Sequence, residues 1–240
     1  MIQMPFEDRI WAGRCLAHEL ERRGIPAETI VVGIARGGVP VAYEVADRLH
    51  FVLDVIAARR IAAPWQPEIT LGAIVGAESV LDDPLIDAMG ISSCDLNEIV
   101  SREQDVAAQE NVVYHRDSPI LNVCGRPVVV IDDGLDTGDT MLAAVREIRR
   151  RQPSLIVAAA PVGPARAFDR LRKQADQIVC VEIPAHFIAK GEYFRHFDDV
   201  DDEAIQNLLL ANRCQQARFQ AIKDRCAVSP EPESSRAGLR

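Results

Sequence analysis

The residues best suited to chemistry stand close together in the nine-residue run DDGLDTGDT at 132–140. Its second half, with Thr137, Gly138 and Thr140, combines loop amides with hydroxyl groups, which together can bind a phosphate monoester. Asp132 and Asp133 cannot contact that phosphate, because like charges about 5 Å apart repel by roughly 3 kcal/mol at an effective dielectric constant near 20. The two acids must therefore serve something beside it: vicinal hydroxyls, a metal ion, or both. A ligand with a phosphate at one end and a diol next to it is a ribose 5-phosphate.

The segments on either side of this run would place it between a strand and a helix. The four β-branched residues at 128–131 predict a strand that is buried on both faces. From Thr137 onward the apolar residues recur at helical spacing over 141–148, and Pro153 ends the helix. Two other interpretations remain open at this point. The run could merely cap a helix, or its acids could form a Mg-dependent phosphatase or receiver-type corner, although such sites do not require the Thr-Gly loop.

Basic residues follow two other predicted strands. The apolar stretch 29–34 runs into ARGG at 35–38, which contains the tripeptide RGG at 36–38, and an arginine pair at 59–60 follows the stretch 52–58. A glycine pair lets a ligand approach bare amides, and guanidinium groups offer planar forks for phosphate oxygens. Because ligands bind at the carboxyl ends of the strands in open α/β sheets, these positions favour an anion site. A simple chain turn and a solvated strand end are the alternatives.

The remaining periodicities predict the rest of an α/β chain. We expect Trp11 to pack in the core and the stretch 61–68 to be a loop leading into a strand at 69–75. Four helices are expected at 6–23, 95–115, 165–175 and 201–210, the last running on toward Cys226, and further strands at 78–84, 155–162 and 177–183.

Composition bounds the class of protein. The 240 residues carry a net charge of -9 with a pI near 5.1, which argues against a general nucleic-acid binder or a binder of anionic membranes. No apolar run approaches the roughly 18 residues that a membrane span needs. The six cysteines are scattered, so we expect reduced thiols in the cytoplasm. We expect one domain over 1–226 and a disordered Pro- and Ser-rich tail over 227–240.

DDGLDTGDT resembles the 5-phosphoribosyl-1-pyrophosphate (PRPP) binding motif of the type I phosphoribosyltransferases, in which an apolar strand and two acids precede TG-x-T. RGG at 36–38 is similar to their pyrophosphate loop. Residues 59–73 resemble one largely uncharacterised bacterial subgroup, although Arg60 stands where that subgroup usually has Lys, and Trp65-Gln66 where Gly-Asn is common. The resemblance covers roughly residues 6–212.

The resemblance implies an α/β fold in which a mostly parallel twisted sheet is flanked by helices and carries a small hood or flexible loop. It implies a Mg-dependent glycosyltransferase of the pentosyltransferase class. In such an enzyme a nitrogenous base attacks the anomeric carbon of PRPP, and pyrophosphate leaves. The expected cofactor is Mg²⁺, carried by PRPP and reaching Asp132 and Asp133 at most through water. PRPP and the base are the expected partners, and a homodimer is among the expected assemblies.

Residue roles follow from the resemblance position by position. Catalytic roles are implied for Asp132, Asp133 and Asp136. The implied PRPP cradle comprises Asp132, Asp133, Gly134, Leu135, Asp136, Thr137, Gly138, Asp139 and Thr140. Pyrophosphate is expected against Arg36, Gly37, Arg59 and Arg60. In purine-using relatives an aromatic ring covers the base, and Phe187 is the candidate here, although simple packing explains its segment equally well.

The acceptor is left open by the sequence. In the 6-oxopurine enzymes the position of Asp136 holds an Asp that exchanges a proton with the base, which favours a purine-like acceptor and a place in purine salvage. Loop capping explains Asp136 almost as well, and a pyrimidine- or amide-type acceptor would differ only in this half of the site. The main alternative in function is a PRPP- or nucleotide-sensing regulator without turnover. The presence of Arg36 and Arg60 argues against a regulator without turnover, because a sensor has less need of these basic residues.

Overall fold

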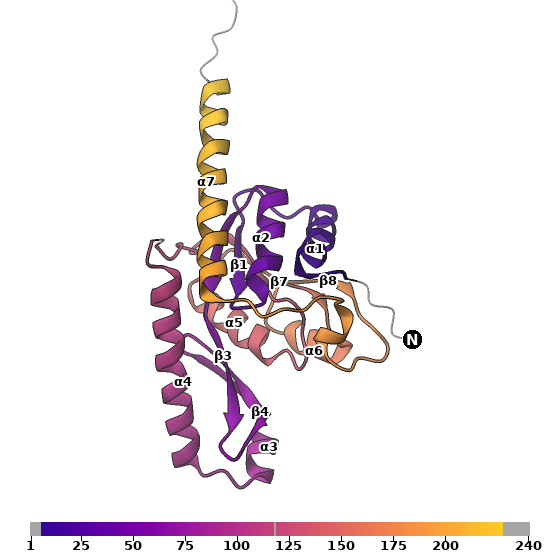
Figure 1. The fold of residues 1–240 in the computed structure, drawn as a ribbon, viewed down its shortest axis with the longest axis vertical. Helices are drawn as coiled ribbons and strands as arrows, with labels where there is room; N and C mark the ends of the chain where they lie inside the picture. The colour runs from indigo at the N-terminus through magenta and orange to yellow at the C-terminus, as the bar shows by residue number, and fades with distance from the viewer. Residues whose placement is uncertain (1–5, 118, 228–240) are drawn as a thin grey trace, which may run out of the picture.

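The computed structural model describes residues 6–117 and 119–227, and its centre is a five-stranded parallel sheet (Figure 1). The strand order is β2-β1-β6-β7-β8. These strands are β1 (Ile30–Ile34), β2 (Val52–Ile56), β6 (Pro127–Ile131), β7 (Leu155–Val162) and β8 (Gln177–Glu182). The expected mostly parallel sheet flanked by helices is confirmed.

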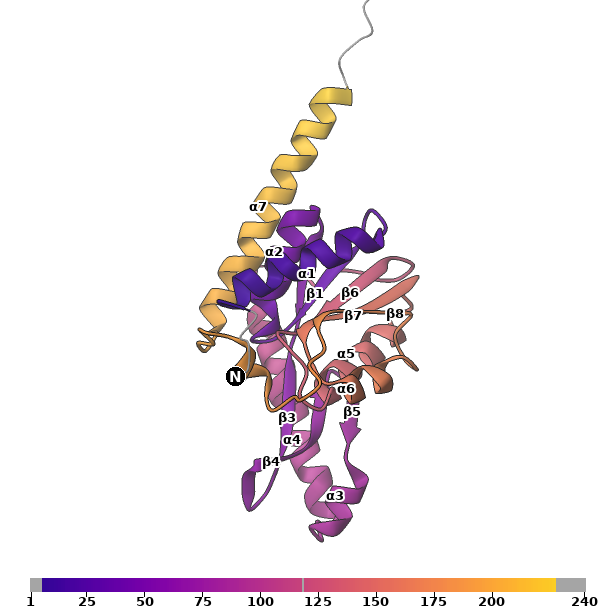
Figure 2. The ribbon, with the colours of Figure 1, turned by 90° about the vertical axis from the view of Figure 1, so that its right-hand side faces the viewer.

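Alternating side chains of the central strands enter two separate apolar layers, which explains why these strands are apolar throughout. On one face lie α5 (Asp139–Arg150) and α6 (Ala165–Leu171), which pack against residues such as Val128 and Val130. The other face is covered mainly by α1 (Arg9–Arg23), α2 (Gly38–Leu49) and the first part of α7 (Asp202–Ala227). The sheet is therefore held rigidly from both sides (Figure 2).

A second, antiparallel sheet of order β3-β4-β5 extends from one end of the central sheet (Figure 2). Its strands are β3 (Ala58–Ala63), β4 (Gln66–Val75) and β5 (Glu78–Leu81), with α3 (Asp83–Ala88) and α4 (Ser93–Tyr114) packed beside them. The prediction of a loop over 61–68 is wrong, because most of these residues belong to the hairpin formed by β3 and β4. Pro64 and Trp65 form its turn, and Pro67 is only the second residue of β4, a position near a strand end that tolerates proline.

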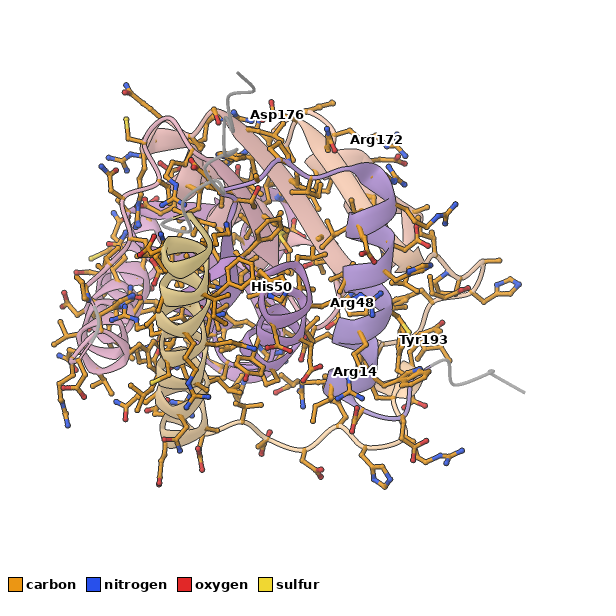
Figure 3. The ribbon with its side chains drawn as sticks, turned by 90° about the horizontal axis from the view of Figure 1, so that it is seen from above. Arg14, Arg48, His50, Arg172, Asp176 and Tyr193 are labelled. Atoms are coloured by element: carbon orange, nitrogen blue, oxygen red, sulfur yellow. The ribbon has the colours of Figure 1, made fainter. Side chains whose placement is uncertain are left out.

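The first helix also differs from expectation. Trp11 is 50% exposed rather than in the core. Small residues face α2 instead: a Cβ built on Gly13 would lie 2.8 Å from the carbonyl oxygen of Val41. The two helices therefore lie too close for a large side chain on that face. Arg14 and Arg48 pair with carboxylates across this contact (Figure 3).

Helix α7 begins on the body and ends well away from it (Figures 1 and 2). Asn212 fixes its first half, because its Oδ1 accepts the Leu53 amide at 2.9 Å. Further along, the ring of Phe219 stacks on His50, which is labelled in Figure 3. The expected disordered tail lies, from residue 228 onward, outside the described residues. In the part of the chain that is described, no helix is both long and apolar enough to cross a bilayer.

A buried histidine joins α4 to the edge strand β2. His115 Nδ1 lies 2.8 Å from the carbonyl oxygen of Asn111, and Nε2 lies 2.8 Å from Oδ1 of the buried Asp54. Both partners are acceptors, so both ring nitrogens donate only when the imidazole is protonated. Burial lowers the pKa of His115, but the hydrogen bonds to Asp54 and Asn111 outweigh it and raise the pKa above its ordinary value.

This pair predicts a pH-dependent stability. Because the pKa of His115 is raised in the folded chain, its contribution is full below about pH 6.5 and is lost as the pH rises through the folded pKa. Replacing His115→Gln should lower the free energy of unfolding by about 2 kcal/mol at pH 6, and by less at pH 9. Urea unfolding of both proteins at the two pH values measures this. An equal loss at both would contradict the assignment.

Candidate active site

The acid pair lies at the carboxyl end of the central strand β6. Asp132 is 7% exposed and Asp133 2%. Just beyond them the buried Leu135 anchors the corner, because its amide donates to the carbonyl oxygen of Val162 at 2.9 Å. Gly138 then adopts a φ of +85°, which few other residues tolerate, and it is the N-cap residue directly before α5. The 136–140 loop thus ends in a helix N-terminus beside two buried acids.

The loop after β1 approaches this corner very closely. A Cβ on Gly38 would lie 2.6 Å from the carbonyl oxygen of Ile131, and one on Gly37 would collide with the Asp133 carboxylate. The glycine pair is therefore needed for contact between the two loops as well as for exposing amides. The peptide bond between Ala35 and Arg36 is cis.

Two cations from distant parts of the chain converge on Asp133. Its Oδ2 accepts from Arg9 Nε at 2.9 Å, and its Oδ1 accepts from Lys190 Nζ at 2.6 Å. Asp8 caps α1 and so makes Arg9 its first residue, while Lys190 begins the short 3-10 helix η1 (Lys190–Tyr193). The N-terminal segment pairs with the chain after η1 through the Phe6–Phe194 bridge, which brings the two cations together.

The charges of Arg9 and Lys190 affect the pKa values of the two acids differently. Burial raises the pKa of Asp132 to about 7, a rise that Lys190, at 3.9 Å from its Oδ1, only partly offsets. For Asp133 burial acts in the same direction, but the charges of Lys190 and Arg9 outweigh it and lower its pKa. The same ion pairs raise the pKa of Lys190 against its own burial. Asp133 therefore loses its proton more readily than Asp132 does.

A cavity of about 840 Å³ opens over this corner. It is lined by most of the predicted site, namely Arg36, Gly37, Arg60, Asp132, Asp133, Gly134, Leu135, Asp136, Thr137, Gly138, Asp139 and Thr140. Arg59 lines a second cavity of about 480 Å³, which shares Arg36 and Arg60 with the first. The structure therefore brings the acid, phosphate-loop and arginine candidates to one cleft.

Phe187 is the candidate that the structure places elsewhere. Its ring stacks on Tyr193 with centroids 5.5 Å apart, and it is not among the residues that line the cavity. Phe197 lines the cavity instead, with the Arg9 guanidinium 3.8 Å from its ring centroid. The alternating aromatic residues of this segment divide between its own small core and the ligand side, and the sequence pattern does not say which ring faces which way.

The loop acids also have protein partners. Asp136 is exposed, and its Oδ1 accepts the Lys190 amide at 2.9 Å. Asp139 accepts from the Thr137 hydroxyl at 2.6 Å and pairs with Arg170 at 2.7 Å. The negative charge of Asp139 beside the expected phosphate position is thus compensated by a guanidinium on α6.

Sequence reasoning missed Arg9, Lys190 and Phe197. None belongs to the motif, and each reaches the cavity only through the pairing of the N-terminal segment with the chain around η1. The acid pair itself could have indicated that cations were missing from the predicted site, because two adjacent carboxylates in a sheet core require cationic partners.

The model of the phosphoribosyl transferase domain family matches residues 26–196. The chain belongs to this family. A protein of Thermus thermophilus, TT1426, is similar to this phosphoribosyl transferase domain in sequence and structure. Its crystal structure shares 37% sequence identity with the chain and superposes with a TM-score of 0.71, covering 87% of this chain and 99% of that one.

A Mycobacterium tuberculosis protein, provisionally named as a phosphoribosyl transferase, is 37% identical to this chain over 212 residues. The match covers 87% of the chain but 47% of that protein. The chain thus spans about half the length of the curated relatives it matches.

The electrostatics of the acid pair can be tested in this phosphoribosyl transferase domain directly. Because Lys190 partly offsets the burial of Asp132, replacing Lys190→Gln should raise the pKa of Asp132 further above about 7. Carbon-13 NMR titration of the Asp132 carboxyl measures the shift. The exposed Lys173→Gln is the matched control and should leave the titration unchanged. An unchanged pKa in Lys190→Gln would contradict the assigned contact.

Proposed function

We propose that this chain is a phosphoribosyltransferase that moves the ribose 5-phosphate of PRPP to a nitrogenous base and releases pyrophosphate. The observation that carries the proposal is the meeting, in one cavity, of a buried acid pair with a loop that begins a helix. The loop amides can bind a phosphate, and the two acids can bind adjacent hydroxyl groups. Groups for a phosphate and groups for hydroxyls in the same cavity suit a phosphorylated pentose.

The 5-phosphate would bind the amides of 136–140 at the start of α5, where the helix dipole favours a negative charge. The ribose hydroxyls would face Asp132 and Asp133. Asp133 stays ionised and accepts, whereas Asp132, with its pKa near 7, can donate or accept as the hydroxyl orientation requires. Orientation of the sugar in this way presents its anomeric carbon to the acceptor.

Pyrophosphate would lie toward Arg36, Gly37 and Arg60, which line the same cavity. Arg59, from the neighbouring cavity, belongs to the same cationic group. A Mg²⁺ ion would keep phosphate oxygens and water as ligands, with the acid pair in contact through water, because Mg²⁺ dehydrates reluctantly. When bound, the ion would neutralise charge on the departing pyrophosphate.

The acceptor side of the cavity comprises Asp136, Lys190 and Phe197. The Arg9 guanidinium covers one face of the Phe197 ring, so a planar base would contact the remainder of that ring. The ring, together with an acid that can exchange a proton with the base, favours a purine-like acceptor. In this proposal Phe197 takes the place that the sequence suggested for Phe187.

Turnover is tested by pyrophosphate release from PRPP and Mg²⁺ across a panel of purine and pyrimidine bases. We expect release with a purine-like base, and a loss of roughly 100-fold in kcat/KM in Asp133→Asn, because that variant removes the charge facing the sugar hydroxyls. Calorimetric binding of PRPP without release under any base would favour a PRPP-sensing regulator. Absence of both binding and release would overturn the proposal.

The position of the base is tested by two aromatic variants. Phe197→Leu should raise the KM for the base by about tenfold and leave the KM for PRPP unchanged, because stacking on a ring contributes about 1–3 kcal/mol per base. Phe187→Leu should change neither constant, since its ring packs on Tyr193. The reverse pattern would restore Phe187 as the base-binding ring.

A further inference from the structure

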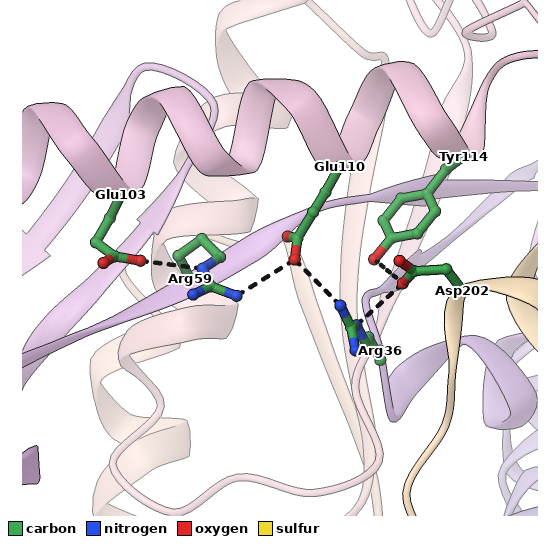
Figure 4. Close-up of polar contacts among 6 residues, drawn as sticks. All are labelled: Arg36, Arg59, Glu103, Glu110, Tyr114 and Asp202. Carbon is green, nitrogen blue, oxygen red and sulfur yellow. Dashed lines mark hydrogen bonds and ion pairs between the residues drawn. The ribbon is translucent and has the colours of Figure 1, made fainter.

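Two of the three arginines expected at the pyrophosphate side, Arg36 and Arg59, contact carboxylates of a helix outside the central sheet (Figure 4). Glu110, on α4, directs a single oxygen, Oε1, at both Arg36 Nη2, at 3.4 Å, and Arg59 Nη1, at 3.2 Å. Glu103, two turns earlier on the same helix, contacts Arg59 Nε at 3.0 Å. One helix face thus engages two guanidinium groups that come from the β1–α2 loop and from β3.

A further carboxylate completes the group from the other side. Asp202, at the start of α7, lies 3.1 Å from Arg36 Nε and accepts the Tyr114 hydroxyl at 3.1 Å (Figure 4). Burial, together with the neighbouring acids Glu110 and Asp202, raises the pKa of Tyr114 to about 12, so its hydroxyl keeps its proton and donates.

Charged residues of both signs line the 480 Å³ cavity. Arg36, Arg59, Arg60 and Lys190 are cationic, and Glu110 and Asp132 are acidic. A subsite for a polyanion ordinarily carries a net positive charge, which Glu110 reduces here. Here Glu110 is mostly buried, with 15% of its side chain exposed, and it lines the 480 Å³ cavity together with Arg36, Arg59 and Arg60. Its carboxylate therefore faces the space that a pyrophosphate would share.

We propose that Glu110 is an internal competitor of pyrophosphate, a carboxylate that holds Arg36 and Arg59 and thereby weakens the binding of the leaving group. The inference rests on the proposed function, since it concerns the pyrophosphate side of the same cleft. Pyrophosphate must draw the two guanidinium groups away from Glu110 Oε1 and tolerate its charge. The consequence is a leaving-group site that releases its product easily, and a specific role for α4 in setting that affinity.

The opposite role is physically distinct. If Glu110 instead oriented the arginines toward pyrophosphate, removing its charge would weaken binding. A competitor predicts tighter binding when the charge is removed. The sign of one affinity change therefore separates the two roles.

The test is calorimetric titration of the full chain with inorganic pyrophosphate and Mg²⁺. Glu110→Gln should bind pyrophosphate about five- to tenfold more tightly than the wild type, because a partly exposed ion pair changes an equilibrium by up to about fivefold and Glu110 makes two. Glu103→Gln, which touches Arg59 but not Arg36, should tighten binding by a smaller factor. Glu98→Gln, an exposed residue of the same helix, is the matched control and should bind like the wild type.

The possible outcomes test the inference and the proposed function separately. Unchanged or weaker binding in Glu110→Gln, with wild-type thermal unfolding, would overturn the inference and leave the proposed function intact. Should Glu110→Gln fold poorly, Glu103→Gln decides alone, and equal or weaker binding there would equally overturn it. If the wild type and every variant fail to bind pyrophosphate, the proposed function fails at this subsite and the inference fails with it.

Discussion

Two adjacent carboxylates buried at the end of β6 are the constraint on which this structure depends. Isolated charges in such a place are costly, and two of them repel each other. Arg9 and Lys190 both contact Asp133 and compensate its charge, and the pKa of Asp132 is raised. Since Arg9 begins α1 and Lys190 lies 181 positions later, the compensation ties the first helix to the segment after β8.

The parallel order of the sheet supplies the other half of the site. Because β1 pairs with β6, the loops that follow these two strands meet at one edge, and Gly37 and Gly38 let them approach to within contact. The amides of the 136–140 loop, the acids and the arginines are thereby brought together from separate loops at one edge of the sheet. The antiparallel sheet and α4 then flank the arginine side, where Glu110 joins the same group of charges.

The sequence was sufficient for whatever depends on local pattern. The strand Leu155–Val162 was predictable from its own apolar run, because such runs and the turns that bound them are local features. The fold class and the grouping of 132–140 with Arg36 and Arg60 came from the resemblance of the motifs to a known family. The predictions that were wrong depend on contacts between distant parts of the chain. Helix α1 buries a face of mostly small and aliphatic residues and leaves Trp11 half exposed, and the hairpin over 61–68 forms although Pro64 lies in its turn and Pro67 in its second strand.

The central claim is that this acid pair and loop form one site for a phosphorylated pentose. Its most direct test is a crystal structure of the chain soaked with ribose 5-phosphate. The account predicts the phosphate against the amides of 136–140 and the ring hydroxyls within hydrogen-bonding distance of Asp132 and Asp133. A sugar phosphate that binds elsewhere, or an acid pair that remains closed against Arg9 and Lys190 at saturating ligand, would contradict it.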